Sequence, residues 1–107
     1  MSDTLGRIKK LVSNGDYRIS EHGYDELAAD GWLAREVVAG LTEASMVEDY
    51  PDYPKGPCVL VLQENRIGQP VHAVWEIPKG EDKPAVLVTA YQPDPQQWTD
   101  DFMRRKS

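Results

Sequence analysis

Cys58-Val-Leu-Val-Leu-Gln-Glu64 is the first of three apolar, β-rich runs that decide the fold of this chain. The second run covers residues 71–77 and the third covers residues 85–91. The segments between them, residues 66–70 and 78–84, contain the glycine and proline residues that favour tight connections. Three consecutive strands with short connections predict an antiparallel sheet built from hairpins.

The residues before these runs predict three helices and one further strand. The helices are expected at roughly residues 3–13, after the N-cap residue Ser20, and at roughly residues 33–41. Residues 17–19 are expected to be a short extended link, and Ser45–Tyr50 is a candidate strand.

The stretch Thr89-Ala-Tyr-Gln-Pro-Asp-Pro-Gln-Gln-Trp98 leaves the last strand through a proline corner. Pro95 at a first helical turn predicts a short C-terminal helix at roughly residues 95–104, and Trp75 and Trp98 are expected to anchor the core. Helices followed by consecutive strands predict an α+β fold, with N-terminal helices on one face of an antiparallel sheet of three to four strands. The length of 107 residues suits a single domain, residues 1–107.

The hairpin turns also predict which residues face one another. Turns centred near residues 67–68 and 81 place Gln63 opposite His72, Val61 opposite Val74, and Val74 opposite Val88. The helices are then expected to cover the sheet face of Cys58, Leu60, Leu62, Ala73, Trp75, Ile77, Leu87, Thr89 and Tyr91. On the other face, Val59, Val61, Val74, Val86 and Val88 would remain uncovered. Such an apolar patch predicts a homodimer.

Charge and composition indicate the cellular compartment in which the chain is expected and whether it contacts a membrane. The net charge is −6, and residues 21–52 carry nine acidic residues against Arg35 alone. No apolar run approaches the roughly 18 residues that span a membrane, and residues 1–6 lack the pattern of a secretory signal. The single cysteine, Cys58, is typical of a reducing compartment, so we expect a cytoplasmic protein without membrane contact.

The two histidines, His22 and His72, are the candidate groups for proton transfer. His22 falls in the first turn of a predicted helix, where the helix dipole favours a neutral imidazole that can accept a proton. His72 falls in a predicted strand, and Tyr91 ends another. A surface role for His22 and a structural role for His72 are the alternatives. Two histidines without a cysteine pair have no zinc-ligand spacing, so no metal and no cofactor are expected.

Three segments carry a resemblance to a known family: Ser20-Glu-His22-Gly-Tyr, Pro70-Val-His72 and the stretch from Thr89 to Trp98. Because of these segments, residues 18–98 resemble the bacterial family called domain of unknown function 4258. That family looks like a relative of the RelE and BrnT toxins, so the resemblance implies a RelE-like α+β fold used for RNA cleavage. His22 and His72 occupy the histidine positions of the family.

The resemblance therefore implies a metal-independent RNA endonuclease or a degenerate toxin relative, with RNA and an antitoxin protein as partners. The catalytic residues would be His22, His72 and Tyr91. The phosphate-binding residues would be Arg7, Lys10, Arg18 and Arg104.

A second hypothesis is a non-catalytic protein-binding module with an acidic helical face. The family tends to have arginine where this chain has Glu26 and Asp30, and acidic residues there repel phosphate. The family's serine or threonine cap of the third helix is also replaced, by Leu33.

Overall fold

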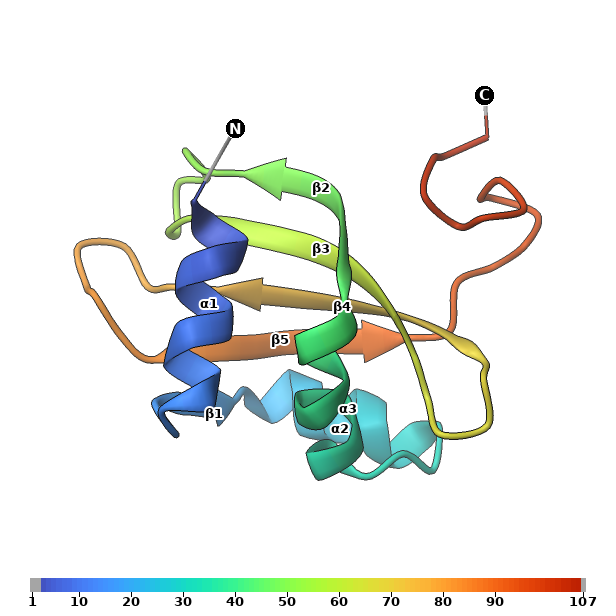
Figure 1. Ribbon diagram of the computed structural model, residues 1–107, viewed down its shortest axis with the longest axis horizontal. Helices are drawn as coiled ribbons and strands as arrows, with labels where there is room; N and C mark the ends of the chain where they lie inside the picture. The colour runs from blue at the N-terminus through green and yellow to red at the C-terminus, as the bar shows by residue number, and fades with distance from the viewer. Residues whose placement is uncertain (1–2, 107) are drawn as a thin grey trace.

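The computed structural model describes residues 3–106, in which three α-helices accompany five strands (Figure 1). In chain order the elements are α1 (Thr4–Ser13), β1 (Tyr17–Ile19), α2 (Glu21–Ala29), α3 (Ala34–Gly40), a 3-10 turn (Leu41–Glu43), β2 (Ser45–Tyr50), β3 (Cys58–Glu64), β4 (Pro70–Glu76) and β5 (Ala85–Tyr91). The strands form one sheet in the order β1-β5-β4-β3-β2. This arrangement confirms the α+β class, the three helices and the antiparallel pairing of β2 with β3, β3 with β4 and β4 with β5.

The sheet is mixed, however, so the prediction of a purely antiparallel sheet is wrong. Residues 17–19, expected to be a link, pair in parallel with residues 85–87 of β5. Two backbone bonds extend this pairing, from Ala85 N to Asp16 O and from Ser20 N to Leu87 O. A three-residue segment is too short to show the alternation by which a strand is recognised in a sequence.

Ser20 caps α2 as predicted and also ties it to the sheet. Its Oγ atom accepts a hydrogen bond from Gly23 N at 3.0 Å and donates one to Val88 O at 2.9 Å. A Cβ atom on Gly23 would lie 2.9 Å from the carbonyl oxygen of Leu87, so only glycine allows the helix to approach β5 this closely. The first turn of α2 is therefore fixed against β5.

The prediction of a C-terminal helix at roughly residues 95–104 is also wrong. Residues 93–106 form an irregular segment, which we call the strap. Asp94 accepts a bond from Gln96 N at 2.8 Å, and Asp101 accepts one from Met103 N at 3.0 Å. Aspartate side chains that bind nearby backbone N–H groups compete with helix formation. The strap instead folds back on itself, with a bridge between Trp98 and Arg105.

The predicted registers differ from the structure in both hairpins. In the first, His72 lies opposite Leu62 instead of Gln63. The Asn65 side chain accepts bonds from Ile67 N and Gln69 N, which centres the turn on Ile67 and shifts the pairing by one residue. In the second, Val74 lies opposite Thr89, because the ladder between β4 and β5 contains a bulge.

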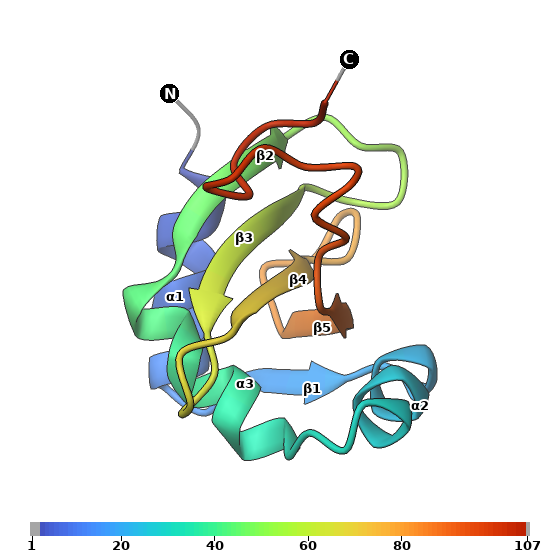
Figure 2. The same ribbon diagram turned by 90° about the vertical axis from the view of Figure 1, so that its right-hand side faces the viewer.

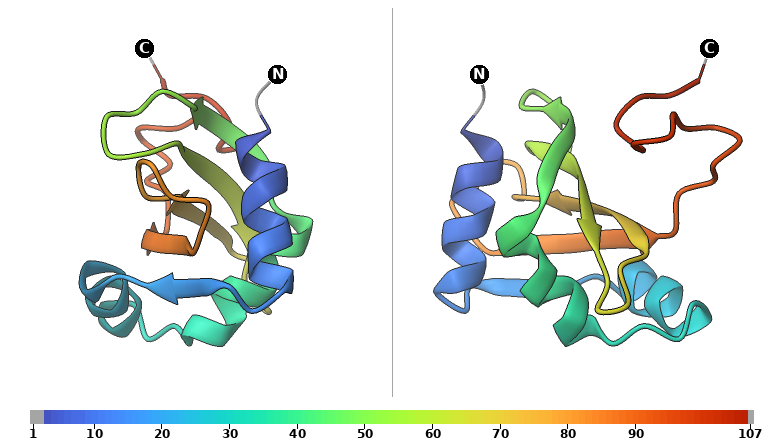
Figure 3. Two further views of the ribbon diagram at one scale, coloured as in Figure 1. Left: turned by 90° about the vertical axis from the view of Figure 1, so that its left-hand side faces the viewer. Right: turned by 45° about the vertical axis from the view of Figure 1, so that its right-hand side comes forward.

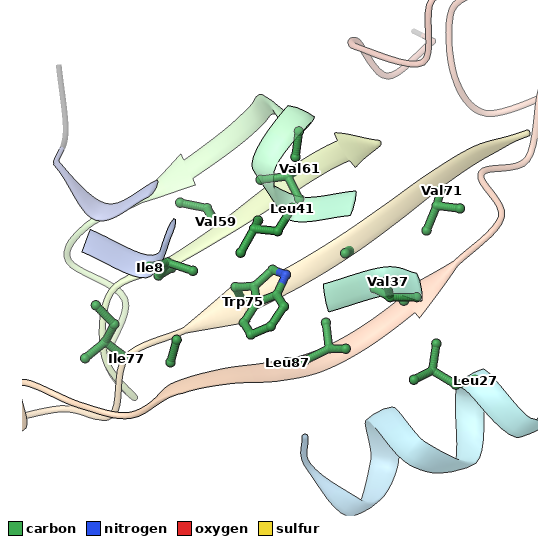
Figure 4. Packing of buried hydrophobic residues seen from close by; sticks show 14 residues of the cluster. Ile8, Leu27, Val37, Leu41, Val59, Val61, Val71, Trp75, Ile77 and Leu87 are labelled. Atoms are coloured by element: carbon green, nitrogen blue, oxygen red, sulfur yellow. The ribbon is translucent and has the colours of Figure 1, made fainter. Parts of the chain in front are cut away.

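The shift in the first hairpin changes which residues the helices cover. Val59 and Val61, expected on an uncovered face, are fully buried in the core together with Trp75 (Figure 4). Ile8 of α1 and Val37 of α3 pack over this face. Trp98 is buried as well, so both tryptophans are core anchors as predicted.

The strap lies on the opposite side of the sheet from α1 and α3, as Figures 2 and 3 show. We call this side the open face; the side chains of β3 and β4 that point to it are Cys58, Leu60, Leu62, His72, Val74 and Glu76, of which Cys58, Leu60 and His72 are buried. None of the helices within residues 3–106 is both long and apolar enough to cross a membrane.

Candidate functional site

A groove of about 390 Å³ runs over the open face. Its floor is apolar and consists of Leu60, Val74 and Val88. The loop between β2 and β3 forms one wall with Tyr53 and Lys55, and the strap forms another. The remaining lining residues are Glu48, Tyr50, Cys58, Val59, Glu76, Tyr91 and Arg105.

An ion pair joins the strap to the rim of this groove. Arg105 Nε donates to Glu48 Oε2 at 3.0 Å, and Arg105 Nη2 donates to Glu48 Oε1 at 3.2 Å. Tyr50 donates its hydroxyl to the same carboxylate at 2.9 Å. The hydrogen bonds from Arg105 are the main reason that the pKa of Glu48 lies below its ordinary value, so this carboxylate is ionised at neutral pH. The guanidinium carbon of Arg105 also lies 4.7 Å from the centre of the Trp98 ring.

His72 holds the strap from underneath. Its side chain is fully buried, and its Nε2 atom lies 2.8 Å from the carbonyl oxygen of Phe102. A carbonyl oxygen only accepts, so Nε2 carries the proton in this bond and the neutral ring has its lone pair on Nδ1. The ring also contacts Trp98 edge-on, with a centroid distance of 4.4 Å. Burial lowers the pKa of His72, which keeps the ring neutral at pH 7.

Of the three predicted catalytic residues, the structure brings two together. The rings of His72 and Tyr91 are 5.6 Å apart, and burial raises the pKa of Tyr91. His22 lies in a different environment on α2, where its side chain is 64% exposed and its Nε2 atom is 3.5 Å from Glu26 Oε1. Neither nitrogen of His72 reaches the surface, because Nε2 is bound to the strap and Nδ1 is buried, with no hydrogen-bond partner among residues 3–106. His72 therefore meets no substrate while the strap is in place.

The four predicted phosphate-binding residues are exposed but do not converge. Arg7 and Lys10 lie on α1, Arg18 lies on β1, and Arg104 lies on the strap. Because α1 and the strap occupy opposite sides of the sheet (Figure 2), one phosphate group does not meet both. Their arrangement gives no single basic surface of the kind that nucleic acids require.

Cys58 lines the groove but is not prepared for nucleophilic chemistry. Burial is the main cause that raises the pKa of its thiol, and the nearby carboxylates of Glu76 and Asp49 raise it further. Reactive cysteines have the opposite surroundings, which stabilise the thiolate. The thiol therefore contributes to the groove as a small apolar group.

Sequence reasoning missed the residues that build the groove. Glu48 and Arg105 are 57 positions apart, so no local pattern indicates their ion pair. Tyr50 ends the predicted strand Ser45–Tyr50 and Tyr53 follows in the proline-containing loop, and neither position carried a signal of a binding surface. The adjacent arginines, Arg104 and Arg105, were the available signal, but the helix predicted at roughly residues 95–104 gave no indication that Arg105 contacts the sheet.

A family model described as Domain of unknown function (DUF4258) matches residues 19–92, which is more than half of the chain. The matched span contains His22, His72 and Tyr91, whereas the strap follows it. No curated protein and no solved structure matches the chain.

Proposed function

This chain belongs to the family described as domain of unknown function 4258, and we propose that it is a protein-binding module that docks a partner segment in the groove of its open face. The observation that carries the proposal is the groove itself, whose apolar floor is left uncovered by the helices. Two walls of different origin, a loop and the strap, make it a shaped recess on this face of the sheet.

The residue types around the groove are those of protein interfaces. Tyrosine and arginine are enriched where partners bind, and here Tyr50, Tyr53 and Arg105 surround the floor. Tyr50 and Tyr53 are among the exposed large side chains, and their rings contact each other edge-on at 6.5 Å. Val74 and Val88 are half-buried, so an apolar side chain of the partner placed on them would remove their remaining surface from water, which stabilises the complex.

The paired charges of the rim suit such a complex. Glu48 and Arg105 already neutralise each other, so covering them leaves no single unpaired charge buried. Lys55 and Glu76 also line the groove, carry charges of opposite sign, and form no ion pair within residues 3–106. The partner is therefore an extended segment with an apolar anchor and polar flanks.

Site-specific photocrosslinking in the native cell tests this proposal. A photoreactive amino acid at Tyr53 is expected to give one dominant protein adduct, which a second change, Val74→Arg, abolishes. The same amino acid at Asn14, exposed at the end of α1, is the matched control and is expected to give no such adduct. Equal adducts from both positions, or an adduct that survives Val74→Arg, would contradict docking in the groove.

Metal-independent RNA cleavage is a second proposal, and the closeness of His72 and Tyr91 is the observation that favours it. Both are predicted catalytic residues, and a RelE-like relationship would give them that role. RNA cleavage requires the strap to move so that His72 becomes accessible, and it requires phosphate binding by a chain of net charge −6. The groove requires neither, so binding is the function that the geometry supports better.

A further inference from the structure

We propose that the strap is a self-docked segment that covers part of the partner site, and that the partner displaces it with an aromatic side chain and an arginine of its own. The inference rests on the proposed protein-binding function and adds how that site is regulated. The strap is docked when Trp98 and Arg105 hold the positions seen in the structure, and it is released when they leave them.

The backbone of the strap forms hydrogen bonds with itself. Thr99 N donates to Arg104 O, and Lys106 N donates to Gln97 O, both at 2.8 Å. Among residues 3–106, no backbone–backbone hydrogen bond joins the strap to a helix or a strand. The strap is therefore a closed loop that can leave the sheet without breaking any strand pairing, and elements held in this way open at low free energy.

Side chains attach the strap to the open face. Trp98 is only 4% exposed, and its ring contacts the His72 ring edge-on. The carbonyl oxygen of Phe102 accepts the hydrogen bond from His72 Nε2. Arg105 pairs with Glu48, and its guanidinium also lies over the ring of Trp98. A buried aromatic anchor, a backbone acceptor and a charged pair are the kinds of contact that hold a docked peptide.

Recesses border the strap on two sides. The groove, of about 390 Å³, is bordered by Arg105. A second recess, of about 710 Å³, is lined by strap residues 100–102, by the end of β3 and by the start of β4 (Figure 1). Leu60 lines the groove and Leu62 lines the second recess, and side chains two residues apart in a strand point to the same face. Release of the strap therefore joins the two recesses into one longer site on the open face.

The strap also lies outside the part of the chain that matches the family. The family model ends at residue 92, and the strap begins at Pro93. The surface that the strap covers, which includes His72 and Glu48, belongs to the matched span. The covered site is thus part of the family domain, whereas its cover is a segment appended to that domain.

The groups that release leaves unsatisfied define the chemistry of the partner. Glu48 loses its bidentate cation, and covering an unpaired carboxylate is unfavourable, so the incoming segment carries an arginine. The His72 ring loses the indole of Trp98, and an aromatic side chain restores that contact. The Nε2–H group of His72 loses its acceptor, which a backbone carbonyl oxygen of the partner replaces. The partner is therefore an extended segment with an aromatic side chain and an arginine.

Binding of the strap sequence in trans tests whether this site accepts a separate segment. The probe is a synthetic peptide of residues 93–106 with blocked ends and a fluorescent label. The full-length variant Trp98→Ala with Arg105→Ala releases its own strap and keeps His72 and Glu48. This variant is expected to bind the peptide on the order of a hundredfold more tightly than wild type, in which the tethered strap competes at millimolar effective concentration.

Matched controls make the result specific. Gln96→Ala with Lys106→Ala changes two exposed side chains of the strap and is expected to exclude the peptide as wild type does. A peptide that carries Trp98→Ala and Arg105→Ala is expected to lose binding to the released variant. Glu48→Lys in the released variant reverses the charge that receives the arginine and should weaken peptide binding about tenfold.

Two results of this experiment would overturn the inference. One is equal binding of the peptide by wild type and by the released variant, and the other is no binding by a released variant that stays folded. Should the double variant unfold, Arg105→Glu takes its place, because it repels Glu48 and keeps Trp98. This variant is expected to bind the peptide about tenfold more tightly than wild type, and a failure to bind it more tightly overturns the inference.

Amide hydrogen exchange of the wild-type protein is an independent check. The N–H groups of Thr99 and Lys106 are expected to exchange at least about a hundredfold faster than those of β3, because the strap opens without the sheet. Equal protection of the strap and β3 would mean that both open together, and it would overturn the inference.

Sedimentation at high micromolar concentration identifies the other possible occupant, the strap of a second copy. An exchange of straps gives a dimer that Trp98→Ala with Arg105→Ala abolishes and that Val74→Arg leaves intact. Such a dimer would overturn the inference, because the strap would then be shared between copies and not displaced by a partner.

The crosslink from Tyr53 in the cell separates failure of the inference from failure of the proposed function. Release of the strap is expected to raise the yield of the adduct about fivefold or more, because the partner no longer competes with the strap. An adduct that release does not raise would reject the competition while the protein-binding function stands. No adduct in either protein would reject the proposed function and with it the partner, even where the peptide binds.

Discussion

The Nε2 atom of His72 lies 2.8 Å from the carbonyl oxygen of Phe102, and this bond fastens the strap to the centre of the open face. Phe102 has a backbone φ of 58°, and it is the one non-glycine residue with positive φ among residues 3–106. A large side chain in this region is unfavourable and persists where surrounding contacts hold it. The hydrogen bond from His72 is one of those contacts, so His72 has a structural role in holding the backbone of Phe102.

Replacing His72 with alanine is expected to release the strap and to lower the free energy of unfolding by about 2–4 kcal/mol. The change removes the bond to Phe102 and leaves a cavity beneath Trp98. Amide hydrogen exchange measures the release, because protection of the strap should fall more than protection of β3. His22→Ala is the control, since that side chain is exposed and its loss should change stability by less than about 0.5 kcal/mol. Undiminished protection of the strap in His72→Ala would contradict the fastening role.

Acid is expected to destabilise the protein through His72. Burial holds the pKa of His72 in the folded protein below its value of about 6.5 in an unfolded chain. The unfolded chain therefore binds the proton first as the pH falls. The contribution of the neutral His72 ring to the free energy of unfolding is therefore present in full above about pH 6.5. It is lost as the pH falls through the lowered pKa. Urea unfolding at a series of pH values measures this loss.

His72→Gln is the matched variant for the pH experiment, because an amide can donate to Phe102 O but does not titrate. The variant is expected to flatten the pH dependence between about pH 6.5 and pH 5, whereas His22 and the carboxylates remain in both proteins. Glu48 faces the same region and also has a lowered pKa, but its loss of stability begins only below its ordinary value of 4.5. An unchanged slope above pH 5 in His72→Gln would refute the assignment.

The ion pair between Glu48 and Arg105 is expected to contribute less than its geometry suggests. The Arg105 side chain is 62% exposed, so solvent and salt screen the attraction. Arg105→Lys removes one of the two hydrogen bonds and the contact with Trp98, and should cost less than about 1 kcal/mol. A double-mutant cycle with Glu48→Gln measures the coupling, which should shrink when salt is added. A coupling of several kcal/mol that is insensitive to salt would contradict this view.

The purified protein is expected to leave RNA intact when no metal is added, because His72 is covered and the predicted phosphate-binding residues are dispersed. Incubation of a long transcript with wild type, His22→Ala and His72→Gln checks this. Cleavage by wild type that His22→Ala lowers about tenfold or more in a folded protein would establish the ribonuclease alternative.

Self-association stays a prediction, but the residues responsible change. Val59 and Val61 are buried under the helices, whereas Val74 and Val88 form the partly exposed apolar floor of the groove. Without a partner, this floor is expected to pair weakly with a second copy at high micromolar concentration. Sedimentation of wild type and Val74→Arg measures the association, which the substitution should abolish. A monomeric wild type would contradict the prediction.

The features with local signals were predictable from the sequence, and those that depend on distant partners were not. Ser20 before a polar turn identified the start of α2, and three apolar runs identified β3, β4 and β5. Asn65 shifted the first hairpin by one residue through its own side-chain bonds, and period-two alternation cannot detect such a shift. His72 was recognised as a notable residue, but its task depends on the carbonyl oxygen of Phe102, 30 positions away in a segment predicted to be helical.

The parallel pairing of β1 with β5 has a consequence for the order in which the chain assembles. Tyr17 and Ala85 are separated by most of the sequence, and the cap of α2 also donates to Val88. Contacts this distant require a large loop to close before they contribute any stability. During synthesis, β1 and α2 leave the ribosome early. They cannot pack against β5 until β5 has also left the ribosome. The first-made third of the chain, residues 1–36, is thus the last to become native, and for that interval it depends on its charged side chains, seven of them acidic, to stay in solution.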